Sequence, residues 1–192
     1  MHPPHPRSLG RRLGALVRDV LEAAVLAVGL FLALQYSLQN TVVEGDSMEP
    51  NFVDRQWLLV SKLSYRNHAP ERGDVIVFHA PDQPGQDFIK RVVALPGEEV
   101  RLRQGRVYID ERLLPEPWSP RFDAEDFGPY TVPPGTVFVL GDNRRVSNDS
   151  RRWEGVGAAL AVTQIVGEAW LTVWPPELWG AANPAAASAA AP

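Results

Sequence analysis

Short apolar runs separated by proline and glycine constrain this 192-residue chain more than any other feature of its sequence. Six runs are rich in Val, Ile, Phe and Trp, which favour strands, and turn-forming segments such as APERGD, APDQPG, LPG and VPPG interrupt them. One run, VRLRQGRVYI, alternates apolar and polar residues around Gln104-Gly105, which predicts a β-hairpin. We therefore expect a mainly β, sandwich-like or barrel-like domain with strands in 56–63, 74–80, 88–95, 99–110, 135–142 and 167–175.

One segment near the N-terminus does not follow this pattern. Residues 20–38 read VLEAAVLAVGLFLALQYSL, and as a helix they would rise about 28 Å, close to the hydrocarbon thickness of a bilayer. Four arginines precede the segment and none follows it closely, which favours an N-terminus on the cytoplasmic side. The sequence therefore predicts a single-pass helix in the cell (plasma) membrane.

Three other interpretations compete for this segment. A cleaved signal peptide would need a small-residue cleavage site, which QYSLQNTV lacks, and the residues after Arg11-Arg12 match a twin-arginine signal poorly. A buried helix of a soluble domain stays open, because the strictly apolar part covers only 23–34.

The favoured organisation is a cytoplasmic basic tail (1–19), a transmembrane anchor (20–39), an extracytoplasmic catalytic β domain (40–178) and a disordered Ala/Pro-rich tail (179–192).

Composition excludes several classes of chemistry. The net charge of −4 argues against a nucleic-acid partner, and the lack of cysteine excludes disulfides, a thiolate nucleophile and a cysteine zinc site. The four histidines lie in separate settings without an H-E-x-x-H motif, so we expect no metal and no cofactor.

Lysine usage singles out one basic residue. The chain has 19 basic residues, of which only Lys62 and Lys90 are lysines, and Lys90 lies in the apolar run FIKRVVAL. A buried lysine can lose its proton, which arginine cannot do in a protein, so Lys90 is a candidate general base. A strand lysine whose amine reaches solvent is the alternative.

Two polar segments could complete such a site. Ser47 lies in VVEGDSMEPNF, where Gly45 and Pro50 suggest a turn that presents the hydroxyl beside free backbone N–H groups. The segment GDNRRVSNDSR (141–151) follows the apolar run TVFVL and could orient a catalytic group. Each segment alone is equally consistent with an ordinary solvated loop.

Four segments together resemble the bacterial type I signal peptidases. They are Gly45-Asp46-Ser47-Met48-Glu49-Pro50, then Arg72 to Phe78 (RGDVIVF), then Phe88 to Glu98 (FIKRVVALPGE), and finally Gly141-Asp142-Asn143-Arg144 with Ser147, Asp149, Ser150 and Arg151. Their order, behind an N-terminal apolar segment, matches that family across most of residues 20–175.

The resemblance implies a small all-β signal-peptidase/LexA-like protease domain on a single N-terminal transmembrane helix. It makes Ser47 the nucleophile and Lys90 the general base of an endopeptidase that removes signal peptides from secretory preproteins, with small residues preferred at −1 and −3. Ser147 would hydrogen-bond the lysine amine, and ion pairs of Asp149 with Arg151 and of Arg144 would hold the last segment. A small apolar substrate pocket would be formed by Val43, Met48, Phe52, Phe88 and Ile89.

Two positions depart from the family pattern. Asn51 stands where most members have threonine, and Gly45 stands where some members have a serine that joins the oxyanion hole. The Ser47 N–H is then the main oxyanion donor, with the Gly45 N–H or a water as a second. We also expect no carboxylate to contact the Lys90 amine, because a nearby negative charge would stabilise its protonated form.

Two rival functions were considered. Self-cleaving LexA-type repressors also use a Ser/Lys pair, but they are soluble and carry a DNA-binding or partner segment in front. A catalytically inactive membrane-anchored β module that binds exported chains is the other rival, and the intact Ser47 and Lys90 argue against it.

Overall fold

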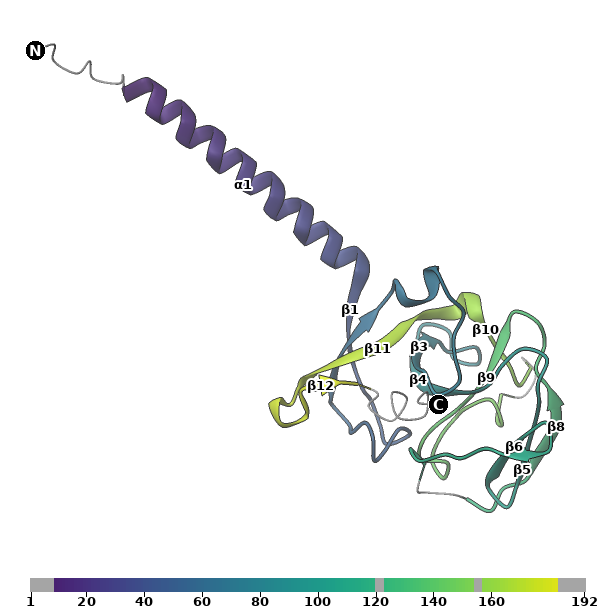
Figure 1. Cartoon of the computed structure of the whole chain (residues 1–192). Helices are drawn as coiled ribbons and strands as arrows, with labels where there is room; N and C mark the ends of the chain where they lie inside the picture. Colours follow the sequence, from purple (N-terminus) through teal and green to yellow (C-terminus); the bar gives the residue numbers. More distant parts are fainter. Residues whose placement is uncertain (1–8, 120–122, 154–156, 183–192) are drawn as a thin grey trace, which may run out of the picture. The chain divides into compact units, whose positions relative to one another are not determined.

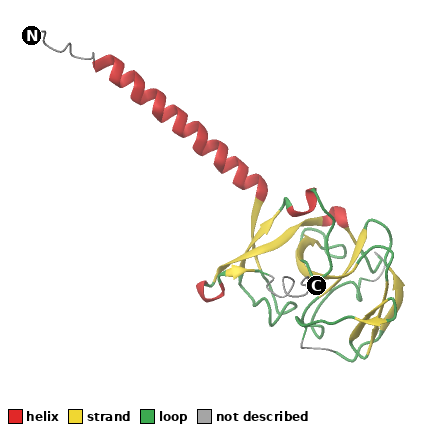
Figure 2. Ribbon diagram, viewed as in Figure 1, coloured by secondary structure: helices red, strands yellow, loops and turns green. Residues whose placement is uncertain are grey.

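The computed structural model describes residues 9–119, 123–153 and 157–182. It divides into two compact units, Met1–Ser37 and Leu38–Pro192. The first contains one helix, and the second contains the strands (Figures 1 and 2).

The helix α1 spans Leu9–Ser37. Its sequence has no proline and is rich in Leu and Ala, which are good helix formers, and the Ser37 hydroxyl donates to the Ala33 carbonyl in the last turn (2.7 Å). The helix therefore begins well before the apolar stretch, and Leu38 and Gln39 already belong to the first strand. Its apolar side chains from Leu13 to Leu34 are exposed. No helix in the described part of the chain meets the length and apolarity needed to cross a membrane.

The larger sheet is antiparallel and has eight strands in the order β1-β2-β11-β3-β4-β9-β10, with β12 paired to β11. Its strands are β1 (Leu38–Val42), β2 (Trp57–Ser61), β3 (Val75–His79), β4 (Asp87–Ala94), β9 (Thr136–Leu140), β10 (Leu160–Ala161), β11 (Ile165–Trp174) and β12 (Gly180–Ala181). The late strand β11 thus lies between β2 and β3, which come early in the sequence.

The smaller antiparallel sheet has the order β7-β6-β5-β8 and gathers at one side of the β domain (Figure 1). Its strands are β5 (Glu99–Arg103), β6 (Arg106–Ile109), β7 (Arg112–Leu113) and β8 (Phe127–Thr131). Gln104 and Gly105 both have positive φ (49° and 75°), as a two-residue hairpin turn requires, so the predicted hairpin is confirmed. Short 3-10 turns occupy Ser64–Arg66, Val162–Gln164 and Pro176–Leu178.

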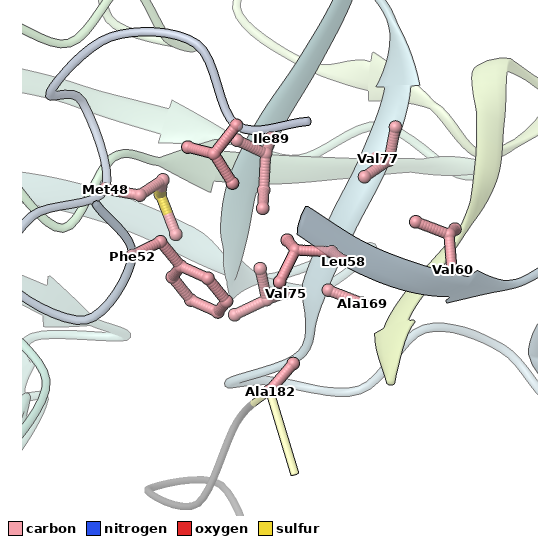
Figure 3. Packing of buried hydrophobic residues seen from close by; sticks show 10 residues of the cluster. Met48, Phe52, Leu58, Val60, Val75, Val77, Ile89, Ala169 and Ala182 are labelled. Carbon is pink, nitrogen blue, oxygen red and sulfur yellow. The ribbon is translucent and has the colours of Figure 1, made fainter. Parts of the chain in front are cut away.

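Three clusters of buried side chains form the core. Strand β4 is buried from Ile89 to Ala94 and contributes to all three: Ile89 to the first, Val93 and Ala94 to the second, and Val92 to the third. Figure 3 shows the first cluster, in which Ile89 lies close to Met48 and Phe52. The serine-bearing turn and the lysine-bearing strand thus share one core.

The boundary expected for the C-terminal tail differs from the structure. Gly180 and Ala181 pair with β11, and Ala182 is buried in the first core cluster, so these residues belong to the folded domain. Residues 183–192 lie outside the described part of the chain.

Candidate active site

Ser47 and Lys90 meet at a hydrogen-bond distance. Ser47 lies in the turn after β1, where Asn51 N–H and Phe52 N–H both donate to the Met48 carbonyl, and Gly45 adopts a positive φ of 79°. Lys90 lies on β4, 43 residues further along the chain, and its Nζ is 2.9 Å from Ser47 Oγ. A second hydrogen bond from Nζ to the Ile89 carbonyl (2.8 Å) fixes the amine on its own strand.

The surroundings of Lys90 favour its neutral form. Only 4% of the residue is exposed, so the charged amine would be largely removed from water. Burial lowers the pKa of Lys90 to about 8, and the negative charges of Asp149 and Asp142 act in the opposite direction. A substantial fraction of the lysine is therefore neutral just above neutral pH.

Neither carboxylate of the last segment binds the lysine amine, in agreement with the sequence-based expectation. Asp142 accepts from Arg91 Nε (2.8 Å) and Nη2 (2.6 Å), and Asp149 accepts from Arg151 Nε (2.9 Å) and from the Gly141 N–H (3.0 Å). Each carboxylate is thus neutralised by its own arginine, which limits its effect on Lys90.

The expected hydrogen bond from Ser147 to Lys90 is not formed in the structure. Ser147 is fully buried, yet its Oγ has no hydrogen-bond partner among the described residues. The amine donates to Ser47 Oγ and to the Ile89 carbonyl instead. Ser147 packs against Gly141, where an added Cβ would collide with the Ser147 side chain and would lie 2.6 Å from the Ser47 carbonyl oxygen.

The backbone N–H groups of Gly45 and Ser47, expected from the sequence to be oxyanion donors, differ in their hydrogen bonds. The Gly45 N–H, one of the two candidates for the second donor, already donates to Asp54 Oδ1 (2.9 Å). No hydrogen bond of the Ser47 N–H occurs among the described residues. Of these two N–H groups, that of Ser47 is the one without a hydrogen-bond partner among the described residues.

Sequence reasoning placed Asn143 in the polar segment 141–151 but gave it no role of its own, and the structure shows that it holds the serine turn. Asn143 donates from its backbone N–H to the Ser47 carbonyl (3.0 Å) and from Nδ2 to the Asp46 carbonyl (3.1 Å). Asn143 follows Asp142 directly, so the buried ion pair and the serine turn are linked through two adjacent residues. Asn143 lies in a polar segment that follows a buried strand, which suggests a functional role. The carbonyl groups to which it donates hydrogen bonds could not be predicted from that segment.

The expected ion pairs of the last segment are present, and their acidic partners extend beyond it. Arg151 pairs with Asp149, and its Nη1 also lies 3.0 Å from Asp123 and 2.9 Å from Glu125. Arg144 pairs with the buried Glu116, whose pKa is raised by burial and lowered in part by Arg144. Glu116, Asp123 and Glu125 lie between β7 and β8 of the smaller sheet, and sequence reasoning did not select them.

Asn51, the departure from the family pattern, joins the Arg91–Asp142 pair. Its Nδ2 donates to Asp142 Oδ2 (2.7 Å) and to the Trp118 carbonyl (2.6 Å), while the Arg91 guanidinium stacks over the Trp118 ring (4.9 Å). An amide thus makes both hydrogen bonds, whereas a threonine hydroxyl has one proton to donate.

A cleft with a volume of about 670 Å³ opens beside Ser47 and Lys90. Of the five residues predicted to form the substrate pocket, Phe88 and Ile89 line it, together with Val77 from β3 and Thr41 and Val42 from β1. Val43, Met48 and Phe52 do not line it. They are buried in the first core cluster, because the turn that presents Ser47 directs its apolar side chains into the domain.

Among the described residues, no group of three or more His, Asp or Glu side chains is arranged to hold a metal ion.

Comparison with known proteins identifies the family. The family model of signal peptidase, peptidase S26, matches residues 17–174. The probable signal peptidase I-1 of Synechocystis sp. is 36% identical over 172 residues, which cover 85% of this chain and 86% of that protein. Signal peptidase I of Bacillus caldolyticus is 36% identical over 154 residues, or 73% of this chain and 81% of that protein.

A crystal structure of a signal peptidase I from Enterococcus faecalis is 32% identical to the chain, with a TM-score of 0.45 over 52% of this chain and 95% of that one. The family model covers most of the β domain, including all four motif segments. The chain therefore belongs to the signal peptidase family, peptidase S26, as a type I signal peptidase, a serine protease that removes signal peptides from preproteins.

Proposed function

We propose that Ser47 and Lys90 form the catalytic dyad with which this chain cleaves secretory preproteins. The observation that carries the proposal is the 2.9 Å contact between Lys90 Nζ and Ser47 Oγ, formed by an amine that is buried and free of carboxylate contacts. A serine hydroxyl is a weak nucleophile until a base takes its proton, and a neutral lysine at this distance can do so.

Acylation begins with the neutral form of Lys90. One N–H of the amine still donates to the Ile89 carbonyl, so the lone pair is available to the Ser47 hydroxyl. As Oγ bonds to the scissile carbonyl carbon, its proton passes to Nζ, and the carbonyl oxygen becomes an oxyanion that accepts from the Ser47 N–H. The C–N bond then breaks, Lys90 returns the proton to the leaving amine, and the signal peptide stays esterified to Ser47.

Deacylation repeats these steps with water. Lys90 takes a proton from the water that attacks the ester, and Ser47 Oγ recovers that proton as the C–O bond breaks. The signal peptide leaves as a free acid, and the enzyme returns to its starting state. Lys90 acts first as a base and then as an acid in both acylation and deacylation, so the catalytic site needs no third, acidic residue.

The proposed preference for small residues at −1 and −3 rests on the cleft walls. Phe88 and Ile89 from β4 line the cleft that Ser47 and Lys90 also line, and β1 contributes Thr41 and Val42 from the end of the larger sheet. A bound chain would have little room for a large side chain next to Phe88 and Ile89.

Cleavage of a purified preprotein in detergent tests the dyad. Wild type should cut the precursor at its A-x-A site, while Ser47→Ala and Lys90→Ala should lose cleavage and keep precursor binding. Lys62→Ala is the matched control, because Lys62 is the only other lysine of the chain.

Because the pKa of Lys90 is lowered to about 8 and the protonated amine cannot act as the base, kcat/KM should rise with pH and level off above about 8. Full cleavage by Lys90→Ala would mean that another group is the base, and binding without cleavage by wild type would favour the binding-module alternative.

Attachment to a lipid bilayer through α1 is the second part of the proposal, with the sequence favouring a single span and a cytoplasmic N-terminus. Side chains such as Leu26, Leu30 and Phe31 are more than half exposed, and lipid would remove this apolar surface from water. After expression in a bacterial cell, the full chain should stay in the membrane pellet after alkaline carbonate extraction, and an added protease should reach the β domain only from the extracytoplasmic side. Release by carbonate would show surface attachment in place of a span, and recovery in the soluble fraction before extraction would overturn attachment itself.

A further inference from the structure

The peptide that joins Asp46 to Ser47 is held by one donor from its own turn and by one side chain from another segment. Its carbonyl belongs to Asp46 and accepts from the Glu49 N–H (3.2 Å) and from Asn143 Nδ2 (3.1 Å), and its N–H is the oxyanion donor of Ser47. The next carbonyl, that of Ser47, accepts from the backbone N–H of the same asparagine (3.0 Å). Asn143 therefore binds the two peptide carbonyls that flank the nucleophile.

A peptide unit is planar, and its carbonyl and N–H point in opposite directions. Fixing the Asp46 carbonyl on Asn143 therefore fixes the direction of the Ser47 N–H on the other side of the same plane. The hydrogen bond to the carbonyl also polarises the peptide, which strengthens the N–H as a donor. Rotation of this plane would remove the oxyanion donor without displacing the Ser47 hydroxyl or Lys90.

The Gly45 N–H, the backbone donor considered above as a second one, is not free to compensate for such a rotation. The Gly45 N–H is bound to Asp54, and Gly45 has no side-chain hydroxyl. Asn143, in contrast, is well fixed: it is 5% exposed, and the preceding Asp142 is held by Arg91 and, through its carbonyl, by the Ser119 hydroxyl (2.8 Å). A rigid donor thus faces the one peptide whose orientation matters most.

From these contacts we infer that Asn143 is a positioning residue for the oxyanion hole and acts on the transition state through the Asp46–Ser47 peptide. The inference rests on the proposed role of Ser47 as the nucleophile. It predicts that removing the side-chain amide lowers the rate of the chemical step while the base and substrate binding are unchanged.

The test compares Asn143→Leu and Asn143→Ala with wild type in the full chain in detergent. Leucine matches asparagine in size and has no donor, so kcat should fall about 10- to 100-fold, less than the loss typical of deleting an oxyanion donor outright. KM should stay within about threefold, and the acidic limb of kcat/KM should stay where it is in wild type. Alanine leaves room for a water that can donate to the Asp46 carbonyl, so its loss should be smaller.

Gln56→Leu is the control for the loss of a buried amide. Gln56 is 2% exposed, its Nε2 donates to Thr172 Oγ1 (2.8 Å) and its Oε1 accepts from the Val53 N–H (2.9 Å), so its amide binds neither Asp46 nor Ser47. This variant should lose thermal stability and keep kcat.

A peptide boronic acid with alanine next to boron gives a readout independent of turnover. Ser47 Oγ bonds to boron, the hydroxyl proton passes to Lys90, and one oxygen of the tetrahedral adduct occupies the oxyanion position. Asn143→Leu should weaken this inhibitor about 10- to 100-fold and leave the affinity of the corresponding peptide C-terminal amide unchanged.

Two results would overturn the inference. One is a kcat for Asn143→Leu within about threefold of wild type. The other is an equal loss of affinity for the boronic acid and the amide, which would indicate a general structural defect. Ser47→Ala in the same assay separates the two proposals: if it cleaves normally, the proposed dyad fails, whereas an inactive Ser47→Ala beside a fully active Asn143→Leu defeats this inference alone.

Discussion

At Lys90, the burial that lowers the pKa of the amine also lowers the stability of the fold. The pKa falls from 10.5 to about 8, which corresponds to about 3 kcal/mol. Between these two values the unfolded chain binds more protons than the folded one, so the stability of the folded state increases with pH in that window. Below about pH 8, the loss of stability caused by burying the protonated amine is present in full.

Lys90→Met should therefore be more stable than wild type at pH 7, by up to about 3 kcal/mol, because methionine keeps the length of the stem and removes the charge. The gain should shrink as the pH rises from 8 toward 10.5. Urea unfolding at pH 7 and pH 10 measures it. An equal gain at both pH values would contradict the electrostatic origin of the penalty.

Asn51 stands where most family members have threonine. Variants of Asn51 therefore compare an amide with a hydroxyl at the end of the serine turn. Asn51→Ala removes the donor to Asp142 and to the Trp118 carbonyl, and should lower the free energy of unfolding by about 1–3 kcal/mol. Asn51→Thr should lose less, because its hydroxyl can restore one of the two hydrogen bonds. Chemical denaturation of both variants gives the comparison, and a threonine variant less stable than the alanine one would mean that the turn cannot place a hydroxyl there.

Residues with local chemical signals could be predicted from the sequence, and residues defined by distant partners could not. Lys90 is unusual within its own strand, and Ser47 lies between turn formers, so both were selected as candidates. Asn143 was not, because the carbonyl that it binds lies 97 residues earlier in the chain. The pocket assignment of Met48 and Phe52 was wrong for a related reason: sequence places them beside the nucleophile, but only the fold determines which way their side chains point.

At the scale of elements, the end of β9 has no room for a side chain. Gly141 follows this strand directly, and a Cβ there would meet the Ser147 side chain and the Ser47 carbonyl. Gly141 does not adopt a positive φ. A side chain is therefore excluded at this position by lack of space and not by backbone strain.

Gly141→Ala should consequently push the serine turn away from β4. We expect a loss of about 1–3 kcal/mol in stability from overpacking and a fall in kcat of about 100-fold from the displaced nucleophile. Gly14→Ala in α1 is the control, because nothing lies within 4 Å of an added Cβ at that position. Preprotein cleavage and thermal melts measure both effects, and an unimpaired Gly141→Ala would show that the turn shifts freely.

Elements with a long periodic or apolar signal were predicted well. The six runs correspond to β2, β3, β4, the β5–β6 hairpin, β9 and β11. The two-residue strands β7, β10 and β12 are too short to show any periodicity, and β8 contains Gly128-Pro129, which argues against a strand. Strand β1 has the polar sequence LQNTV and exists because it pairs with β2.

At the scale of the whole β domain, buried charges connect the smaller sheet to the catalytic segment. Arg144 and Glu116 are 1% and 3% exposed, and Arg151 reaches Asp123 and Glu125 in the same β7–β8 connection. No sequence pattern pairs these residues, since they lie in separate loops that only the packing of two sheets brings together.

Removing one member of the Arg144–Glu116 pair should be costly. Glu116→Leu leaves a buried arginine without its partner and should lower the free energy of unfolding by about 3–5 kcal/mol. The double variant Glu116→Leu, Arg144→Met should recover at least half of that loss, because no uncompensated charge remains. Urea unfolding of the two single variants and the double variant provides the cycle, and strictly additive losses would show that the pair is not coupled.

The position of β11 has a consequence for the timing of biosynthesis. The turn that carries the nucleophile extends from β1, the base lies on β4, and the sheet connects them through β2, β11 and β3. Residues 165–174 follow both segments in the sequence, so β11 is synthesised after the serine turn and the lysine strand that it connects. We therefore expect Ser47 and Lys90 to reach their 2.9 Å contact only after β11 has been translated.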